Sequence, residues 1–350
     1  MLLYLHIPFC DSKCFYCAFN SYVDKFELKN SYMVSIIEQL KYELKRFSVN
    51  EKSIETIFIG GGTPSTISPK LYEPFFSLIK PYLKENIEIT TEANPNSATL
   101  SWIEGMKNLG VNRISFGVQS FDDKKLKLLG RNHTSNMAKQ AVENAKIANI
   151  KNISLDLIYG TVYDDKKLLE SDITKAFSLP INHISAYSLT LEEGTDFFNK
   201  PQVQNDDENL AFWFANEIKK RGLPQYEISN FGTYNSKHNL GYWQYKDYLG
   251  IGCGAVGFLK DKRFYTQTDI EKYIKNPLDI TVENLSKEDI VTEKILLGLR
   301  SKVGFSKDIL DEEQIKKADI LKDEKKITFK DGIYFNNDYF LSDEIALFIS

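Results

Sequence analysis

Cysteine, long apolar runs and surplus charge are all scarce in this 350-residue chain. It has four cysteines, and three of them, Cys10, Cys14 and Cys17, are crowded together, unlike the dispersed cysteines of a disulfide framework. No stretch approaches the ~20 apolar residues of a membrane span, and the N-terminus lacks the basic start of a signal peptide. The formal net charge of -4 offers no electrostatic argument for binding to nucleic acid. These absences predict a cytoplasmic protein with no transmembrane segment and no nucleic-acid partner.

Alternating strand and helix patterns fill the first half of the chain. Hydrophobic residues make up 42%, enough for a sizeable core. Helical spacing over Tyr32–Phe47 and Ser135–Ala148 separates short apolar runs. The expected strands are Leu2–Ile7, Ile54–Ile59, Ile87–Thr91, Arg113–Val118, Asn152–Ile158 and His183–Thr190. This alternation predicts a parallel sheet with right-handed crossovers, which is either doubly wound or an incomplete TIM-like (β/α)6 barrel.

The pattern changes after Leu191. A polar segment, a helix over 210–222 and a stretch rich in Gly, Tyr and Asn follow. Helical signals at Lys287–Leu299 and Ser306–Ile320 then precede a hairpin turn at Asp331-Gly332 and a last helix, Ser342–Ile349. The chain is therefore expected to have a barrel over 1–195, an extension over 196–285 and a winged-helix-like C-terminal domain over 286–350. Because that domain is not markedly basic, its composition favours packing or interaction over DNA binding.

The three clustered cysteines have the spacing C-x3-C-x2-C, directly after the first expected strand. Three thiolates can ligate three irons of a four-iron cubane and leave the fourth iron open to a ligand. The alternative is a structural zinc site with His6 or His238 as its fourth ligand. Zinc sites favour C-x2-C pairs, so the spacing favours an iron–sulfur cluster.

This motif resembles the signature of the radical S-adenosylmethionine (SAM) superfamily. The stretch from Tyr4 to Phe19 is similar to the branch that contains oxygen-independent coproporphyrinogen III oxidases and HemW heme chaperones. The likeness continues through Gly60-Gly61-Gly62-Thr63-Pro64 to the terminal Leu341-Ser342-Asp343. It implies an α/β fold, a radical SAM (β/α)6 barrel, with a [4Fe-4S] cluster on Cys10, Cys14 and Cys17. It further implies that SAM chelates the open iron and is split by one electron into methionine and a 5′-deoxyadenosyl radical.

Polar residues recur where the expected strands end, which is the active-site face of a parallel barrel. Glu92, Gln119, Asp156 and Thr190 occupy such ends, and Arg131 offers a partner for a carboxylate. The resemblance places ten residues on SAM-contacting positions: Tyr4, Tyr16, Gly61, Gly62, Thr63, Glu92, Gln119, Arg131, Asp156 and Thr190. Among these, the side chains of Glu92, Gln119, Arg131 and Asp156 are expected to bond the ribose or methionyl groups.

Two features distinguish the branches of this family. The oxidases have a fourth cysteine, in C-x3-C-x2-C-x-C, where this chain has Phe19. They also carry a longer segment before the first barrel strand, whereas Tyr4 stands almost at the start here. Both features predict that coproporphyrinogen III is not decarboxylated. Whether SAM is cleaved productively stays open.

The chaperone branch has a motif His-Asn-x-x-Tyr-Trp, present here as His238-Asn239-Leu240-Gly241-Tyr242-Trp243. The resemblance implies that His238 ligates heme iron while Tyr242 and Trp243 cover the porphyrin. Alternatively, His238 satisfies loop backbone groups and the aromatic residues belong to the core. Cys253 is a second ligand candidate, since Val256 stands where a histidine is expected, although a buried thiol is usually just a small hydrophobe.

Taken with the resemblance, these residues predict a HemW-type heme chaperone that passes heme to hemoproteins. Its reductant would be a small protein such as flavodoxin or ferredoxin. One alternative is a porphyrin-linked radical SAM oxidase or methyltransferase. Another, of a different class, is a zinc-site protein with a nucleic-acid-binding winged helix.

Overall fold

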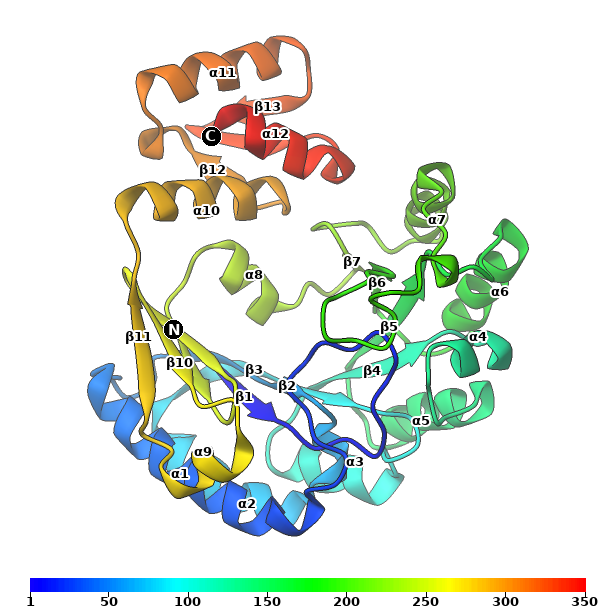
Figure 1. The fold of residues 1–350 in the computed structure, drawn as a ribbon, viewed down its shortest axis with the longest axis vertical. Helices are drawn as coiled ribbons and strands as arrows, with labels where there is room; N and C mark the ends of the chain where they lie inside the picture. The colour runs from blue at the N-terminus through cyan, green and yellow to red at the C-terminus, as the bar shows by residue number, and fades with distance from the viewer.

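The computed structural model describes residues 1–350, and most of its strands belong to one mixed sheet (Figure 1). The strand order is β11-β10-β9-β8-β1-β2-β3-β4-β5-β6-β7. Its centre consists of six parallel strands: β1 (Leu2–Ile7), β2 (Ile54–Gly61), β3 (Leu83–Ala93), β4 (Arg113–Gln119), β5 (Asn152–Tyr159) and β6 (His183–Ser188). A doubly wound sheet reverses its strand order partway, whereas these strands are neighbours in chain order. The order therefore selects the incomplete barrel over the doubly wound sheet.

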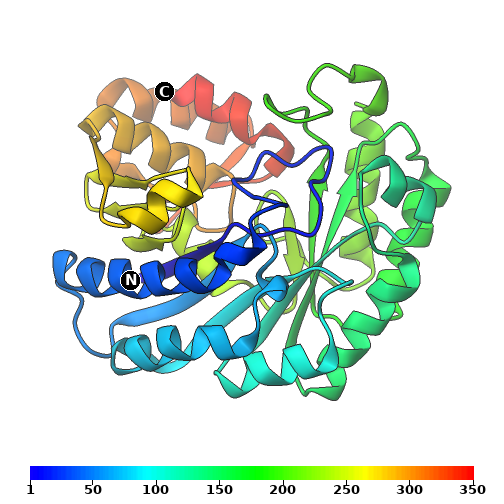
Figure 2. The same cartoon turned by 60° about the horizontal axis from the view of Figure 1, so that its bottom comes forward.

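The crossover helices cover the outer face of these strands (Figure 2). They are α1 (Lys29–Arg46), α2 (Pro69–Ile79), α3 (Leu100–Asn108), α4 (Asp123–Leu128), α5 (Ser135–Ile147) and α6 (Lys166–Phe177). Alternate strand residues such as Leu3, Leu5 and Ile7 join the main apolar core. The other alternation, with Tyr4 and His6, faces the barrel interior, because successive strand side chains point to opposite faces. The interior is therefore lined largely by polar residues.

The extension adds strands at both edges of this sheet. On one edge β7 (Asn230–Gly232) pairs antiparallel with β6, and on the other β8 (Tyr248–Ile251) pairs parallel with β1. Beyond β8 lie β9 (Val256–Leu259), β10 (Lys262–Thr266) and β11 (Ile280–Asn284). The helices of this part are α7 (Glu208–Lys220), α8 (Lys237–Trp243) and α9 (Ile270–Lys275). Since β7 and β11 are the free edges, the barrel does not close.

The C-terminal residues form a separate three-stranded sheet with three helices, coloured orange to red in Figure 1. Its elements are α10 (Lys287–Leu299), β12 (Phe305–Ser306), α11 (Glu312–Asp323), β13 (Ile327–Lys330), β14 (Ile333–Asn336) and α12 (Ser342–Ile349). The hairpin expected at Asp331-Gly332 is present, with both residues at positive φ. This part has its own apolar core, including Leu299 and Tyr334, and meets the extension where the Ile228 N–H donates to the Arg300 carbonyl at 2.8 Å.

Several expected boundaries differ from the structure, most of them by one to three residues. The largest difference is in the helix expected over Ser306–Ile320, because α11 begins only at Glu312 and a short strand and a 3-10 turn precede it. Strand β3 begins at Leu83 rather than Ile87, and β6 ends at Ser188, so Thr190 lies in the following loop. Single 3-10 turns occur at Phe26–Leu28, Pro64–Thr66, Lys80–Tyr82, Pro201–Val203, Lys307–Ile309 and Tyr339–Leu341. None of the helices combines the length and apolar composition that crossing a bilayer requires.

Candidate functional site

The loop that carries the three clustered cysteines is tied down on several sides. The Phe15 N–H donates to the Leu129 carbonyl at 3.2 Å, and the Phe15 carbonyl accepts from the Phe197 N–H at 3.1 Å. Lys13 Nζ donates to the Phe19 carbonyl at 2.7 Å and to Ser21 Oγ at 2.9 Å. Backbone groups from two other barrel loops and one lysine side chain therefore hold the cysteines at the carboxyl end of β1.

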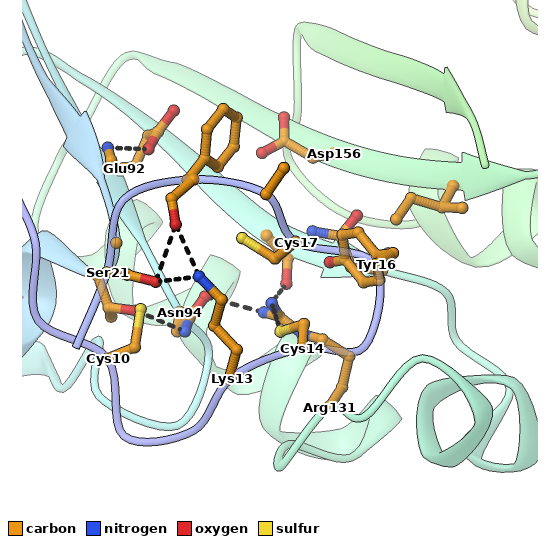
Figure 3. A pocket seen from close by; sticks show the side chains of 18 of the residues that line it. Cys10, Lys13, Cys14, Tyr16, Cys17, Ser21, Glu92, Asn94, Arg131 and Asp156 are labelled. Carbon is orange, nitrogen blue, oxygen red and sulfur yellow. Dashed lines mark hydrogen bonds between the residues drawn. The ribbon is translucent and has the colours of Figure 1, made fainter. Parts of the chain in front are cut away.

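Each of two cysteine sulfurs accepts a hydrogen bond from a neighbouring element (Figure 3). Thr63 Oγ1 donates to Cys10 Sγ at 3.3 Å, and Arg131 Nη1 donates to Cys14 Sγ at 3.3 Å. Burial raises the pKa of the Cys10 and Cys17 thiols, while the donor at Cys10 opposes that rise. All three thiols are free, and all three line one cavity. Donor-supported thiols beside a cavity fit the ligand set of an iron–sulfur cluster.

The zinc alternative finds no support in this geometry. Both ring nitrogens of His6 are engaged, Nδ1 with the Tyr4 hydroxyl and Nε2 with the Asn20 carbonyl, each at 2.9 Å. No three His, Cys, Asp or Glu side chains converge on a point where one metal ion could bind. Thiolates of a cubane bind different irons and need no such convergence.

A cavity of about 460 Å³ opens beside the cysteine loop at the carboxyl ends of the barrel strands. That volume is typical of a small-molecule site. Nine of the ten residues expected to contact SAM line it: Tyr16, Gly61, Gly62, Thr63, Glu92, Gln119, Arg131, Asp156 and Thr190. Tyr4 does not line it. The hydroxyl of Tyr4 instead contacts His6 inside the barrel, and its ring stacks on Phe58 at 6.3 Å.

Two half-buried carboxyl groups face the cavity. Glu92 Oε2 accepts from the Gly61 N–H at 3.1 Å, and Asp156 Oδ1 accepts from Ser115 Oγ at 3.0 Å. Burial, reinforced by the nearby Asp156 charge, raises the pKa of Glu92 to about 8. Burial also raises the pKa of Asp156. The floor of the cavity can therefore gain negative charge when a cation or hydroxyl donors enter it.

Two features of Gln119 are typical of a ligand-binding residue. Its backbone adopts φ 65°, a left-handed conformation that is strained for a non-glycine residue. Its side-chain Oε1 is buried and has no hydrogen-bond partner within the protein. An unpartnered buried acceptor at a cavity wall is expected where a ligand supplies the donor.

Position 62 requires a glycine because the backbone there passes close to the loop after β1. A Cβ added there would lie 2.9 Å from the carbonyl oxygens of Ile7 and Phe9 and 3.0 Å from Cys10 Sγ. The Gly62 N–H meanwhile donates to the Ile7 carbonyl at 2.8 Å. Only glycine leaves space for Cys10 between this turn and the loop after β1.

Asn94 is the site residue that the sequence reasoning missed. It accepts from Arg131 Nη2 at 2.8 Å and donates from Nδ2 to Thr63 Oγ1 at 2.9 Å. The alternation of side chains along a strand could have identified it. Because every second residue of a strand faces the same side, Asn94 follows Glu92 on the inward face.

The residues expected to bind heme are not brought to this cavity. His238 lies in α8 and is fully buried, with Nδ1 2.7 Å from Thr56 Oγ1 and its backbone N–H donating to Glu88. Its ring packs edge-on against that of Tyr242, with the ring centroids 4.7 Å apart. Thr56 lies near the start of β2, whereas the cavity glycines lie at the end of that strand. Trp243 is half-buried, and its Nε1 has no partner.

Cys253 is also separate from the cavity residues. It is buried, and its Sγ contacts the Thr268 carbonyl at 3.1 Å and Asn20 Nδ2 at 3.4 Å. Burial raises the pKa of this thiol to about 12. A thiol that is protonated and enclosed in this way agrees with the interpretation of Cys253 as a small buried hydrophobic residue.

Comparison with known proteins agrees with this geometry. The family model described as the radical SAM superfamily matches residues 4–171, from β1 into α6. The heme chaperone HemW of Lactococcus lactis is 36% identical over 315 residues, 86% of this chain and 82% of that protein. The heme chaperone HemW of Haemophilus influenzae is 40% identical over 269 residues, 73% of this chain and 70% of that protein.

A solved structure shows the same fold. Coproporphyrinogen III oxidase (HemN) from Escherichia coli, a radical SAM enzyme, superposes with a TM-score of 0.81 at 16% identity. The match covers 99% of this chain and 89% of that one. At that identity the likeness establishes the α/β radical SAM fold alone. Together with the similarity to HemW proteins along most of their length, it leads to one conclusion: the chain belongs to the HemW family of the radical SAM superfamily.

Proposed function

We propose that this protein is a heme chaperone that binds heme and transfers it to hemoproteins. The observation that carries the proposal is its similarity, over 82% of their length in the Lactococcus case, to proteins named heme chaperones. Phe19, where the oxidases have a further cysteine, supports the same choice. The similarity to the coproporphyrinogen III oxidase structure concerns the fold alone. It therefore does not favour oxidase activity as a second function.

Membership of the superfamily implies a [4Fe-4S] cluster and SAM. We assign the cluster to Cys10, Cys14 and Cys17, since these thiols line one cavity and two of them already accept hydrogen bonds. When bound, the reduced cluster supplies one electron to SAM. The fourth cysteine, Cys253, is enclosed elsewhere and is left out of the assignment.

The cavity residues divide naturally between the parts of SAM. Glu92 and Asp156 would accept hydrogen bonds from ribose hydroxyls, and Gln119 Oε1 would accept from a further donor. Arg131 keeps N–H donors beyond those bonded to protein, and these would meet the methionyl carboxylate. Gly61, Gly62 and Thr63 would pass beside the methionyl part, with Tyr16 and Thr190 at the wall. Tyr4 lies in the barrel interior away from the cavity lining, so we assign it no direct contact with SAM.

The heme ligand is proposed to be His238, with Tyr242 and Trp243 beside it. Burial lowers the pKa of His238 to about 3, so at neutral pH the imidazole is uncharged, which is the form that ligates iron. Its Nε2 has no partner and is free to ligate. Because this nitrogen is buried, the proposal requires α8 to move before a porphyrin can reach it.

The remaining partners follow from this role. Hemoproteins would receive the heme, and a small reductant protein such as flavodoxin or ferredoxin would supply the electron. We place this exchange in the cytoplasm.

The test is heme titration of protein reconstituted anaerobically with iron and sulfide. A histidine ligand predicts a defined Soret shift, which His238→Ala should lose. Tyr242→Ala and Trp243→Ala should each weaken binding by ~1 kcal/mol, the scale of an aromatic contact beyond its burial. His183→Ala, which removes another buried barrel histidine, should keep the shift and controls for general damage.

A companion assay separates the two branches. With SAM and reductant, the reconstituted protein should not decarboxylate coproporphyrinogen III. If the decarboxylation proceeds and heme binding is indifferent to His238, the chaperone proposal is wrong and an oxidase replaces it.

A further inference from the structure

A chain of side-chain hydrogen bonds joins Cys14 to Cys10 around the rim of the cavity (Figure 3). It begins at Arg131, which donates from Nη1 to Cys14 Sγ at 3.3 Å and from Nη2 to Asn94 Oδ1 at 2.8 Å. Asn94 Nδ2 then donates to Thr63 Oγ1 at 2.9 Å, and Thr63 donates to Cys10 Sγ at 3.3 Å. We call this set, Arg131, Asn94 and Thr63, the rim relay.

The direction of the rim relay is fixed at its charged end. A guanidinium can only donate, so the Asn94 atom facing Arg131 must be the oxygen. The amide nitrogen of Asn94 must then face Thr63 and occupy an acceptor site of its hydroxyl. The hydroxyl proton of Thr63 is left to point at Cys10 Sγ. One fixed positive charge thereby delivers hydrogen-bond donors to two cysteine sulfurs.

The relay is held by further hydrogen bonds, and its Thr63 end is screened from water. Thr63 is only 1% exposed, and its carbonyl accepts from Thr66 Oγ1 at 2.8 Å. The Asn94 backbone N–H donates to Ser65 Oγ at 3.1 Å, and Arg131 Nη2 also donates to the Gly117 carbonyl at 2.6 Å. Hydrogen bonds held in low-dielectric surroundings are stronger than exposed ones.

We propose that Thr63 and Asn94 are positioning residues that raise the reduction potential of the cluster through Cys10. This inference rests on the proposed assignment of the cluster to the three cysteines. Reduction adds one electron, taken from an external low-potential donor, and that charge is shared with the thiolate sulfurs. A donor aimed at sulfur stabilises the reduced state more than the oxidised state, and hydrogen bonds to sulfur are among the determinants of cluster potential. The Thr63 proton stays on its oxygen throughout.

The experiment is a redox titration of reconstituted protein with dithionite and mediators, followed by electron paramagnetic resonance. Thr63→Val keeps the shape of the side chain and removes the donor. Its midpoint potential should fall by up to about 59 mV, the one-electron equivalent of a tenfold change in the reduction equilibrium. Thr63→Ser restores the hydroxyl and should restore the potential. Thr91→Val removes a buried hydroxyl of β3 that bonds only the Glu92 carbonyl, and should change nothing.

A second variant tests the direction of the relay. In Asn94→Asp both oxygens accept, so the Thr63 proton turns from Cys10 to the new carboxylate. The potential should fall, and the fall in the double variant with Thr63→Val should be smaller than the sum of the two single falls.

Failure of this inference is distinguishable from failure of the cluster assignment. A wild-type protein that holds no cluster overturns the assignment. An intact cluster whose potential is the same in Thr63→Val and wild type overturns the relay. Loss of iron from Thr63→Val alone also overturns it, because three thiolates should hold a cluster that the relay merely tunes.

Discussion

Replacing Glu92 with glutamine tests the electrostatics of the cavity most directly. The pKa of Glu92 is raised to about 8, so its charge changes within an accessible pH range. About a tenth of the molecules carry the carboxylate at pH 7, and about nine tenths carry it at pH 9. The carboxylate accepts hydrogen bonds from hydroxyls and attracts the sulfonium of SAM, whereas the protonated acid does neither as well.

We therefore expect SAM to bind about tenfold more tightly at pH 9 than at pH 7, a difference of about 1.4 kcal/mol. The sign follows from the raised pKa, because binding has to expel the proton at pH 7 and has none to expel at pH 9. Glu92→Gln keeps an acceptor for the Gly61 N–H but cannot ionise. Its affinity for SAM should lack this tenfold rise.

The assay is isothermal titration calorimetry on anaerobically reconstituted protein with the cluster oxidised. Repeating the titration in buffers of different ionisation enthalpy counts the protons released on binding. The amino group of SAM also titrates near this range, so the glutamine variant supplies the reference for ligand ionisation. An equal pH dependence in wild type and Glu92→Gln would refute the reasoning.

Three further predictions concern the cluster loop and the barrel. Changing Cys10, Cys14 or Cys17 to alanine should abolish the bound iron, measured by iron and sulfide analysis, whereas Cys253→Ala should retain it. Gly62→Ala should lower iron content while the circular dichroism spectrum stays native, because the added Cβ lies 3.0 Å from Cys10 Sγ; full occupancy would contradict the close-approach argument. Lys125→Met removes one partner of a fully buried ion pair, Lys125 Nζ to Asp164 Oδ1 at 2.6 Å, and should cost about 3–5 kcal/mol of unfolding free energy in urea. The exposed neighbour Lys124→Met is the control, and equal losses in both variants would contradict this origin.

Local sequence patterns determined the elements of this protein and the position of its reactive loop. The six central strands follow from short apolar runs, and α10 and α12 occupy the expected residues, because periodicity and turn chemistry act within a few residues. The cysteine spacing likewise depends only on neighbours in the chain. Glu92, Asp156 and Gln119 could be found because parallel strands end at one edge of a sheet.

The tertiary structure decided how these elements combine. Strand order, which separates the barrel from a doubly wound sheet, depends on which faces pack together and leaves no periodic mark in the sequence. The burial of His238 depends on β2 and β3, whose Thr56 and Glu88 hold α8 from far along the chain. Asn94 acquires its part only because Thr63 reaches it from the end of β2 and Arg131 from the loop after α4. Such contacts join residues tens of positions apart, and their geometry exists only once the sheet has brought the strand ends together.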